Sequence, residues 1–479
     1  MTEVALGLDI GTGSTKAGLV DRSGRLLAVG RAPHPIEEPQ PGWSETDPHC
    51  WLASAREAVA GTLGALGDPI RVVALGFSGQ MHGVVVCGPG LEPLRPAVLW
   101  SDRRSQPDLA AIRDRLGPEG RGRLGNPVVA GMAGPTLSAL GRLEPETLER
   151  AEVILQPKDW VRARLTGEVA TDPSDASATL LWDLLADRWS GGACRACGVD
   201  PAWLPPVLSS SAIGGSLTGD AADDLGLPAG LPVAIGAADT AVALLGAGVA
   251  LGESQLSTGT GGQLARLVDA PTVDPSGRTH LFRGAAGRSW YAMAAIQNAG
   301  IAIDWATRLL GAEPPEVEAA MAAAPAGSGG VTFLPYLTGE RTPHLDAGLT
   351  GTWVGLRPST TRAQLVRSVF EGVAFALRDG LDALRAAGHR VDLALLAGGG
   401  SLAPWWRRLL ADVLEIPLVP HDAADASVRG AGLLAWASAG ADIDAAAVVQ
   451  RSAPVEPSSA GVPALAEARD RFRAAGPAA

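Results

Sequence analysis

Cysteine and long apolar runs are scarce in this chain of 479 residues. Four cysteines are too few for a disulfide framework at this length, which indicates a reducing compartment. Cys194 and Cys197 form a CxxC pair, but no second pair of zinc ligands lies nearby, so we interpret them as two loop thiols. No run of about 18 apolar residues is free of charge, and the N-terminus leads directly into a strand pattern. We therefore expect neither a membrane-spanning helix nor a signal peptide, and a cytoplasmic protein.

Positive charge is also in deficit. The formal net charge is -12 and the isoelectric point is about 5.1, which disfavours nucleic acid or an anionic membrane surface as a partner. Lys16 and Lys158 are the only lysines among the 39 basic residues. A lysine retained in so arginine-rich a chain indicates a position that the planar fork of arginine does not suit. The length exceeds what one hydrophobic core supports, so we expect two or more domains.

The periodicity of apolar residues predicts an α/β chain. We expect strands over 4–10, 15–20, 25–30 and 71–77, and helices over 47–66 and 362–387. The first three strands alternate apolar with small or polar residues and are separated by short turns, which is typical of a meander. Asp47 is the expected cap of the first helix, and Thr361 and Gln364 have the spacing of a capping box at the start of the second.

Two turns rich in glycine and hydroxyl groups, one in each half of the chain, have the composition of phosphate-binding loops. The first, DIGTGST, begins with Asp9, whose carboxylate at a strand end can hold Mg2+, usually through water. The second, at 258–262, follows a short strand over 255–257. A further glycine turn, GGGS, follows a strand over 393–397 and precedes a helix that begins at Pro404. Each turn alone is also typical of an ordinary connection between secondary-structure elements. Their repetition predicts two duplicated domains that bind phosphates from both sides.

Asp239 lies where a strand over 232–235 gives way to a helix over 240–245. Open α/β sheets bind ligands at the carboxyl ends of their strands, which makes Asp239 a candidate catalytic carboxylate. An isolated aspartate in this place would more often be a helix cap.

The hexapeptide SGQMHG follows the strand over 71–77 and places Gln80, Met81 and His82 between glycines, where side chains can reach a ligand. A lone histidine is nevertheless more often structural. Lys158 and Asp159 begin another short helix, and we expect them to border the same pocket.

A series of motifs resembles, in order and over nearly the whole chain, the carbohydrate kinases of the FGGY family. These motifs are GLDIGTGSTKAGLVD, WSETDP, SGQMHG, LWSDRR, PKDW, GAADTA, STGTGG, FLPYLTGERTPH, GTWVGLRPSTTRAQLVRSVFEG and AGGGS. GQMHG and FLPYLTGERTPH look most like the xylulokinases within that family. The resemblance implies two duplicated α/β domains of the actin, Hsp70 and hexokinase (ribonuclease H-like) type, over residues 1–242 and 243–479, with a cleft between them.

The resemblance also implies the site residues. The implied catalytic residues are Asp239, as general base, and Asp9, which also binds Mg2+. The implied sugar-binding residues are Met81, His82 and Asp239. The implied ATP-binding residues are Thr12, Gly13, Ser14, Lys16, Thr258, Gly259, Thr260, Gly399 and Gly400. The implied reaction is in-line transfer of the γ-phosphate of ATP to O5 of D-xylulose, giving D-xylulose 5-phosphate. A base with an ordinary pKa, about 3.9, would suffice. Relatives are often dimers, which makes a homodimer an expectation.

Two departures from the family pattern bear on the sugar. Thr240 stands where many xylulokinases have Asn, and MAGPTLSAL lacks the lysine and tryptophan of the family's first signature. A kinase for another ketose or a polyol, such as ribulose or L-xylulose, would share every ATP feature. A non-catalytic ATP-binding module like actin or Hsp70 would share the turns but lack a base in the cleft.

Overall fold

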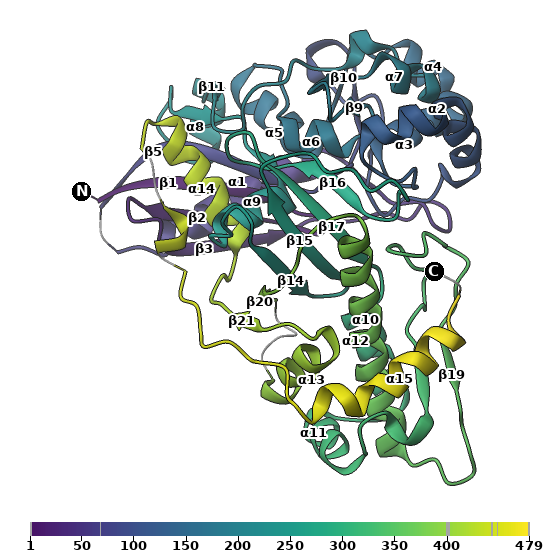
Figure 1. Ribbon diagram of the computed structural model, residues 1–479. Coiled ribbons are helices and arrows are strands. Elements are labelled where there is room, and N and C mark those ends of the chain that lie inside the picture. Colours follow the sequence, from purple (N-terminus) through teal and green to yellow (C-terminus); the bar gives the residue numbers. More distant parts are fainter. Residues whose placement is uncertain (1, 68, 399–402, 442–443, 448, 478–479) are drawn as a thin grey trace.

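The structure is a computed structural model, and it describes every residue except 1, 68, 399–402, 442–443, 448 and 478–479. Two β-sheets form the centre of the molecule, and a largely helical cap extends from the first of them (Figure 1). Within the described residues, no helix combines the length and apolar character needed to cross a membrane.

The first sheet has the strand order β11-β12-β5-β1-β2-β3, with β13 also paired to β5. Its strands are β1 (Thr2–Ile10), β2 (Ser14–Asp21), β3 (Leu26–Pro33), β5 (Ile70–Gly79), β11 (Ile213–Ser216), β12 (Pro232–Ala234) and β13 (Ala237–Ala238). β1, β2 and β3 are antiparallel, as the predicted meander requires, and β5 joins β1 in parallel. The helix predicted next is confirmed as α1 (His49–Gly64), although Asp47 accepts the His49 amide without capping the helix.

The second sheet repeats this plan in the order β16-β17-β15-β14-β20-β21. Its strands are β14 (Ser254–Thr258), β15 (Gly262–Val268), β16 (His280–Arg283), β17 (Trp290–Ile296), β20 (Ala394–Ala397) and β21 (Leu418–Pro420). Antiparallel strands lead into two parallel ones, as in the first sheet. The predicted duplication of an α/β domain is therefore confirmed.

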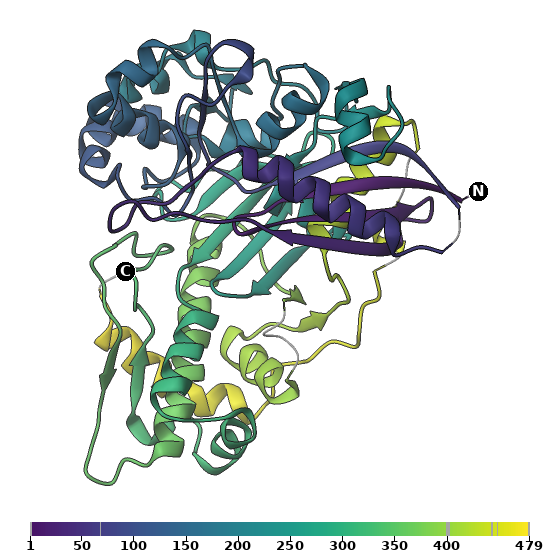
Figure 2. The same ribbon diagram turned by 180° about the vertical axis from the view of Figure 1, so that it is seen from behind.

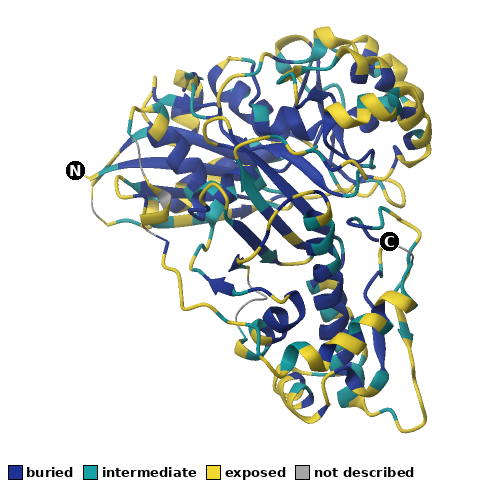
Figure 3. Ribbon diagram, in the orientation of Figure 1, coloured by how far each residue is buried: buried dark blue, intermediate teal, exposed yellow. Residues whose placement is uncertain are grey.

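The helices around the second sheet are α10 (Gly300–Leu309), α11 (Pro314–Ala323), α12 (Arg362–Ala386), α13 (Pro404–Leu414) and α15 (Gly461–Ala475). α12 begins with the predicted capping box, in which Thr361 accepts the amide of Gln364. A two-stranded ladder of β18 (Thr332–Leu334) and β19 (Thr352–Val354) packs beside α12. The strands are largely buried, whereas the outer helices expose one face (Figure 3).

The helical cap contains α2 (Leu109–Leu124), α3 (Ala133–Leu143), α4 (Pro145–Glu149), α5 (Pro157–Thr166), α6 (Pro173–Ala178) and α7 (Gly191–Cys197), and α8 (Gly219–Leu225) lies beside α1. Short ladders pair β4 (Glu45–Thr46) with β7 (Ala97–Val98), β6 (Val85–Cys87) with β8 (Val153–Leu155), and β9 (Trp182–Asp183) with β10 (Arg188–Trp189). The interpretation of Cys194 and Cys197 as loop thiols is wrong, because both lie on α7 and are buried. Burial raises their pKa to about 11 and about 12, so both stay protonated.

One C-terminal helix, α14 (Ala426–Ser438), packs on the first sheet (Figures 1 and 2). Glycines in β1 and β5 permit this contact, since a Cβ at Gly7 would lie 2.2 Å from Val428 O and a Cβ at Gly76 would lie 2.0 Å from Ala431 O. α14 also contacts α9 (Asp239–Gly246). The expected division between residues 242 and 243 falls inside α9.

Replacement of Gly76 by alanine is expected to lower the melting temperature, because the new methyl group would overlap the α14 backbone. Overpacking of this kind costs about 1–3 kcal/mol. The control is Gly61→Ala, at an exposed position inside α1 where an added Cβ meets nothing within 4 Å. Since alanine favours a helix interior over glycine by roughly 0.5–1 kcal/mol, this variant should be at least as stable as the parent. Equal melting temperatures for both variants would contradict the close packing.

Candidate functional site

Asp9 lies at the end of β1 and is held by serines from two distant parts of the chain. Ser78 lies beside it in the β1–β5 register and donates its hydroxyl to Asp9 Oδ1 at 2.7 Å. Ser427, near the start of α14, donates to Oδ2 at 2.7 Å. The carboxylate is therefore oriented by both the first sheet and the returning C-terminal helix.

Asp239 is the first residue of α9 and directly follows β13. β13 pairs in parallel with the last residues of β5, which brings Asp239 to the edge of the sheet where Asp9 lies. Gly236 permits the approach: its φ is +82°, and a Cβ there would lie 2.5 Å from Phe77 O. Asp9 and Asp239, which are far apart in the sequence, are thus brought to the same sheet edge by the pairing of β1 and β13 with β5.

Burial, and then the charge of Asp9, raise the pKa of Asp239 to about 7. Thr240 opposes this shift, because its amide and hydroxyl donate to Asp239 Oδ1 at 2.6 Å and 3.3 Å. From the sequence, an ordinary pKa was held to suffice for the base, whereas in this arrangement the pKa is raised. The difference arises because burial disfavours the charged form and a second carboxylate lines the same cavity.

Asp9 and Asp239 line the same cavity of about 270 Å³, together with residues of both sheets. Gln255, Ser257 and Gln263 contribute from β14 and β15. The described part of the chain contains no group of three or more His, Cys, Asp or Glu side chains that could hold a metal. Mg2+ typically binds one or two carboxylates together with water and phosphate oxygens. This donor set fits a Mg2+–polyphosphate better than a metal caged by protein alone.

The first glycine turn begins beside this cavity, which Gly11 also lines. The Gly11 carbonyl accepts hydrogen bonds from His34 Nε2 at 3.2 Å and from Gln80 Nε2 at 3.3 Å. Gln80, one of the candidate residues in SGQMHG, therefore stabilises the turn through a hydrogen bond to its backbone. Its side-chain nitrogen is committed to the backbone.

The residues assigned to ATP in this turn are placed in different ways. Thr12, Gly13 and Ser14 are at least partly exposed. The Thr12 hydroxyl accepts a hydrogen bond from Trp100 Nε1 at 2.9 Å, which leaves its proton for another acceptor. The Lys16 ammonium lies 2.7 Å from Asp425 at the start of α14. Lys16 can contact a phosphate only by leaving or sharing this partner.

The second turn, with Thr258, Gly259 and Thr260, joins β14 to β15 and contacts the start of α10. Gly300 donates its amide to Gly259 O at 2.9 Å, and a Cβ on Gly259 would meet nothing within 4 Å. The turn therefore has open space in front of it. Gly398 lies directly against Thr258, since a Cβ there would be 2.4 Å from Thr258 O. The assigned Gly399 and Gly400 lie outside the described residues.

Met81 contacts Tyr291 of the second sheet, and the His82 ring lies 6.1 Å from that of Phe282, centroid to centroid. The Tyr291 hydroxyl donates to Met81 Sδ at 3.6 Å, and burial followed by the charge of Asp239 raises the pKa of Tyr291. His82 Nδ1 lies 2.6 Å from Ala178 O, so Nδ1 carries the proton and Nε2 presents a lone pair. Burial lowers the pKa of His82 to about 4, so the ring is neutral near pH 7. His82 can accept a hydrogen bond from a ligand hydroxyl at Nε2.

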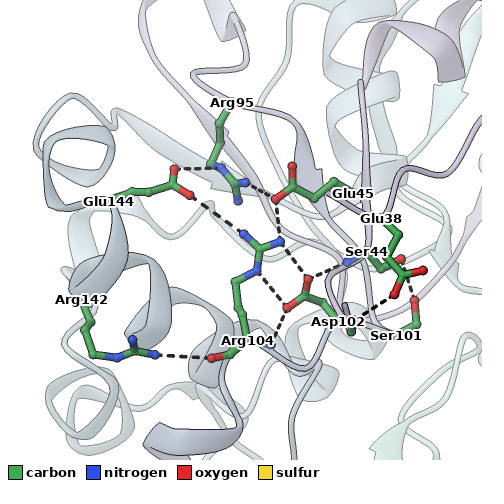
Figure 4. Close-up of polar contacts among 10 residues, drawn as sticks. Glu38, Ser44, Glu45, Arg95, Ser101, Asp102, Arg104, Arg142 and Glu144 are labelled. Carbon is green, nitrogen blue, oxygen red and sulfur yellow. Dashed lines mark hydrogen bonds and ion pairs between the residues drawn. The ribbon is translucent and has the colours of Figure 1, made fainter. Parts of the chain in front are cut away.

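The motifs WSETDP and LWSDRR meet in a buried ionic network (Figure 4). Arg104 donates to Asp102 at 2.9 Å and 2.8 Å and to Glu45 at 2.6 Å, and its side chain is fully buried. Ser44 donates its amide to Asp102 at 2.7 Å. These charges hold two loops together and do not contact the cavity. The neighbouring Trp100 is the residue of this region that reaches the first turn.

Comparisons with known proteins agree with this geometry. Sequence models of the FGGY family of carbohydrate kinases match the chain over residues 4–246 for the N-terminal domain and 255–439 for the C-terminal domain. The chain belongs to this family. The FGGY kinase is 35% identical over 413 residues to a xylulose kinase of Escherichia coli K12, covering 85% of this chain and 84% of that one.

Solved structures place the FGGY kinase in the same fold. A "xyloylose kinase" from Brucella ovis has a TM-score of 0.91 and 34% identity, covering 99% of both chains. A gluconate kinase from Lactobacillus acidophilus has a TM-score of 0.93 at 23% identity, covering 99% of this chain and 98% of that one, and shows the fold alone. The FGGY kinase is thus a two-domain α/β enzyme that phosphorylates a carbohydrate.

Three contributors to the site of this FGGY kinase were not found from its sequence. Ser78 lies within SGQMHG, and its place opposite Asp9 in adjacent strands is a signal that could have found it. Ser427 and Tyr291 lie in segments without a ligand-binding motif. Only the contact of α14 and β17 with the rest of the site brings them in.

His82 of the FGGY kinase is expected to stay neutral, with its proton on Nδ1, between about pH 5 and pH 8, because its pKa is about 4. NMR of protein labelled with 15N-histidine would show the tautomer. Comparison with His82→Gln would assign the signal among the seven histidines. A charged ring at pH 6, or a proton on Nε2, would contradict the arrangement with Ala178.

Proposed function

We propose that this FGGY kinase transfers the γ-phosphate of ATP to O5 of D-xylulose. The observation that carries the proposal is the pair Asp9 and Asp239 in one cavity lined by both sheets. One carboxylate is suited to a metal-bound polyphosphate and the other to a reacting hydroxyl. The similarity to xylulose kinases over more than four-fifths of the chain supports D-xylulose as the acceptor.

Asp239 is the residue we assign as general base. Both hydrogen bonds from Thr240 go to Oδ1, so Oδ2 is the oxygen we assign to the attacking hydroxyl. Proton acceptance by a positioned carboxylate contributes about 10²–10⁴-fold to rate. A pKa near 7 suits this role, because a base with a pKa near the working pH is ionised and still basic.

Charge neutralisation falls to the turns and to Asp9. Phosphoryl transfer has a loose transition state that asks for positioning and electrostatic stabilisation more than for covalent help. Backbone amides and hydroxyls of the turns at 11–14 and 258–262 are the groups we assign to the phosphate oxygens. Mg2+, held by Asp9, usually through water, would supply further positive charge when bound. Closure of the two domains over the sugar would exclude water as a competing acceptor.

Acceptor choice depends on the groups near Asp239. His82 offers one neutral acceptor atom, and Met81 with Tyr291 offers an apolar wall. The neutral His82 ring suits a hydroxyl of an uncharged sugar. Thr240 orients the base through its hydroxyl.

The first test is ADP release by the wild-type enzyme with Mg-ATP and a panel of D-xylulose, L-xylulose, D-ribulose, L-ribulose, glycerol and gluconate. We expect the highest kcat/KM with D-xylulose, because the residues around the base match the xylulokinase pattern. Preference for another acceptor would retain the kinase and assign the difference to the surroundings of Thr240. Turnover of none of them would contradict the proposed function.

The rate is expected to fall on the acid side with an inflection near pH 7, because protonated Asp239 cannot accept the hydroxyl proton. The quantity to measure is kcat/KM for Mg-ATP at saturating sugar, since it reports the enzyme before nucleotide binds. Thr240→Val removes a donor to the carboxylate and should move the inflection to higher pH. Asp239→Asn should lose about 10²–10⁴-fold in kcat and show no such limb. An inflection near pH 4 would contradict the effect of burial.

A further inference from the structure

The short helix α6 forms hydrogen bonds with the residue before Asp239 and with His82, the two residues proposed for the sugar site. It is buried from Ser174 to Ala178. At one end, Ser174 Oγ accepts the amide of Ala238 at 2.8 Å, immediately before Asp239. At the other end, Ala178 O accepts the Nδ1 proton of His82 at 2.6 Å. α6 belongs to the helical cap and packs against β13 of the first sheet and β16 of the second (Figure 1). One rigid turn of helix therefore spans from the base to the histidine.

Asp172 sets the direction in which the Ser174 hydroxyl points. Asp172 is the N-cap of α6, and its Oδ2 accepts the Ser174 amide at 2.9 Å and the Ser174 hydroxyl at 2.5 Å. A serine hydroxyl has one proton. Because that proton is donated to Asp172, the lone pairs of Ser174 Oγ are left to accept from Ala238. The Asp172 carboxylate thus makes Ser174 an acceptor toward the chain that carries Asp239.

Lys158 forms an ion pair with the Asp172 carboxylate. Its ammonium lies 2.6 Å from Asp159, 3.1 Å from Asp172 and 3.0 Å from Asp175, and all four side chains are fully buried. The ammonium donates a hydrogen bond to Asp159 Oδ1 and forms ion pairs with Asp172 and Asp175, an arrangement around one compact charge that the flat fork of arginine would not make. The expectation that Lys158 and Asp159 border the sugar pocket is wrong, because neither side chain has exposed surface. Their charges act through the protein interior.

We propose that Lys158, Asp172 and Ser174 are positioning residues for phosphoryl transfer, which set the spacing of Asp239 from His82 through α6. The inference rests on the proposed roles of Asp239 and His82. None of the three touches the cavity that Asp9 and Asp239 line. They act by fixing the backbone on which the base and the sugar-binding ring are mounted.

Loss of the Ser174 hydroxyl is expected to affect turnover selectively. Without its acceptor, the buried amide of Ala238 has to find another partner, and Asp239 moves with it. Misplacement of a reacting group lowers the rate of the chemical step. The ATP turns lie on other elements and are left intact. We therefore expect kcat to fall while the KM for ATP stays the same.

The test compares Ser174→Ala with Ser210→Ala. Ser210 also donates its hydroxyl to Asp172 Oδ2, at 2.9 Å, and is also buried, but the Ala238 amide donates to Ser174 and not to Ser210. Both variants remove one donor to the same oxygen, and Ser174→Ala also removes the acceptor of the Ala238 amide, so its melting temperature should fall at least as far as that of Ser210→Ala. Ser174→Ala should lose about tenfold or more in kcat, with the KM for ATP within twofold of wild type. Ser210→Ala should keep a kcat close to wild type.

Equal loss of kcat in both variants, or no loss in Ser174→Ala, would overturn the positioning role. If Ser174→Ala does not fold, the isosteric pair Ser174→Thr and Ser174→Val replaces it, and only the valine variant should lose turnover. Wild-type activity is measured first with the sugar panel. Turnover of any acceptor allows the comparison, whereas the absence of turnover is a failure of the proposed function and not of the role of α6.

Discussion

The approach of two carboxylates in one cavity is the constraint on which this molecule is built. Asp9 lies near the end of β1 and Asp239 follows β13, two strands that both pair with β5, and residues of the second sheet line the same cavity. Burial disfavours the charged form of Asp239, the charge of Asp9 adds to this effect, and the pKa of Asp239 rises as a result. A pair of this kind persists only where the surrounding fold dictates it. The hydrogen bonds from Ser78 and Ser427 hold Asp9 in place, and the pairing of β13 with β5 holds Asp239.

The parts of the fold that could be predicted are those specified by neighbours in sequence. Alternation of apolar residues over β1 to β3 and the capping box of α12 are local patterns, and both were confirmed. The hydroxyl turns were also recognised from composition, although their roles in binding stay predictions. Asp239 stood out because a strand pattern ended beside it.

The rest could not be predicted because it depends on contacts between distant segments. Ser427 lies 418 positions from Asp9, and no local pattern marks it as a partner. The pKa of Asp239 depends on burial and on a charge from the other end of the domain, neither of which a sequence displays. Lys158 was placed in the right neighbourhood, but a lysine at a helix start does not show whether it faces a ligand or three buried carboxylates. Cys194 and Cys197 were likewise interpreted as loop thiols, whereas they lie on α7 in a region whose tertiary packing buries them.

The packing of α14 on the first sheet has a consequence for biosynthesis. β1 and β5 present bare glycines to that helix, so the N-terminal half leaves the ribosome before the helix that packs on this face of the first sheet has been made. Translation at roughly 5–20 residues per second leaves this face waiting on the order of ten seconds or more after residue 246 has been made. During that interval the second sheet can form, since its own strands and α12 precede α14. The domain that is translated first is therefore completed last.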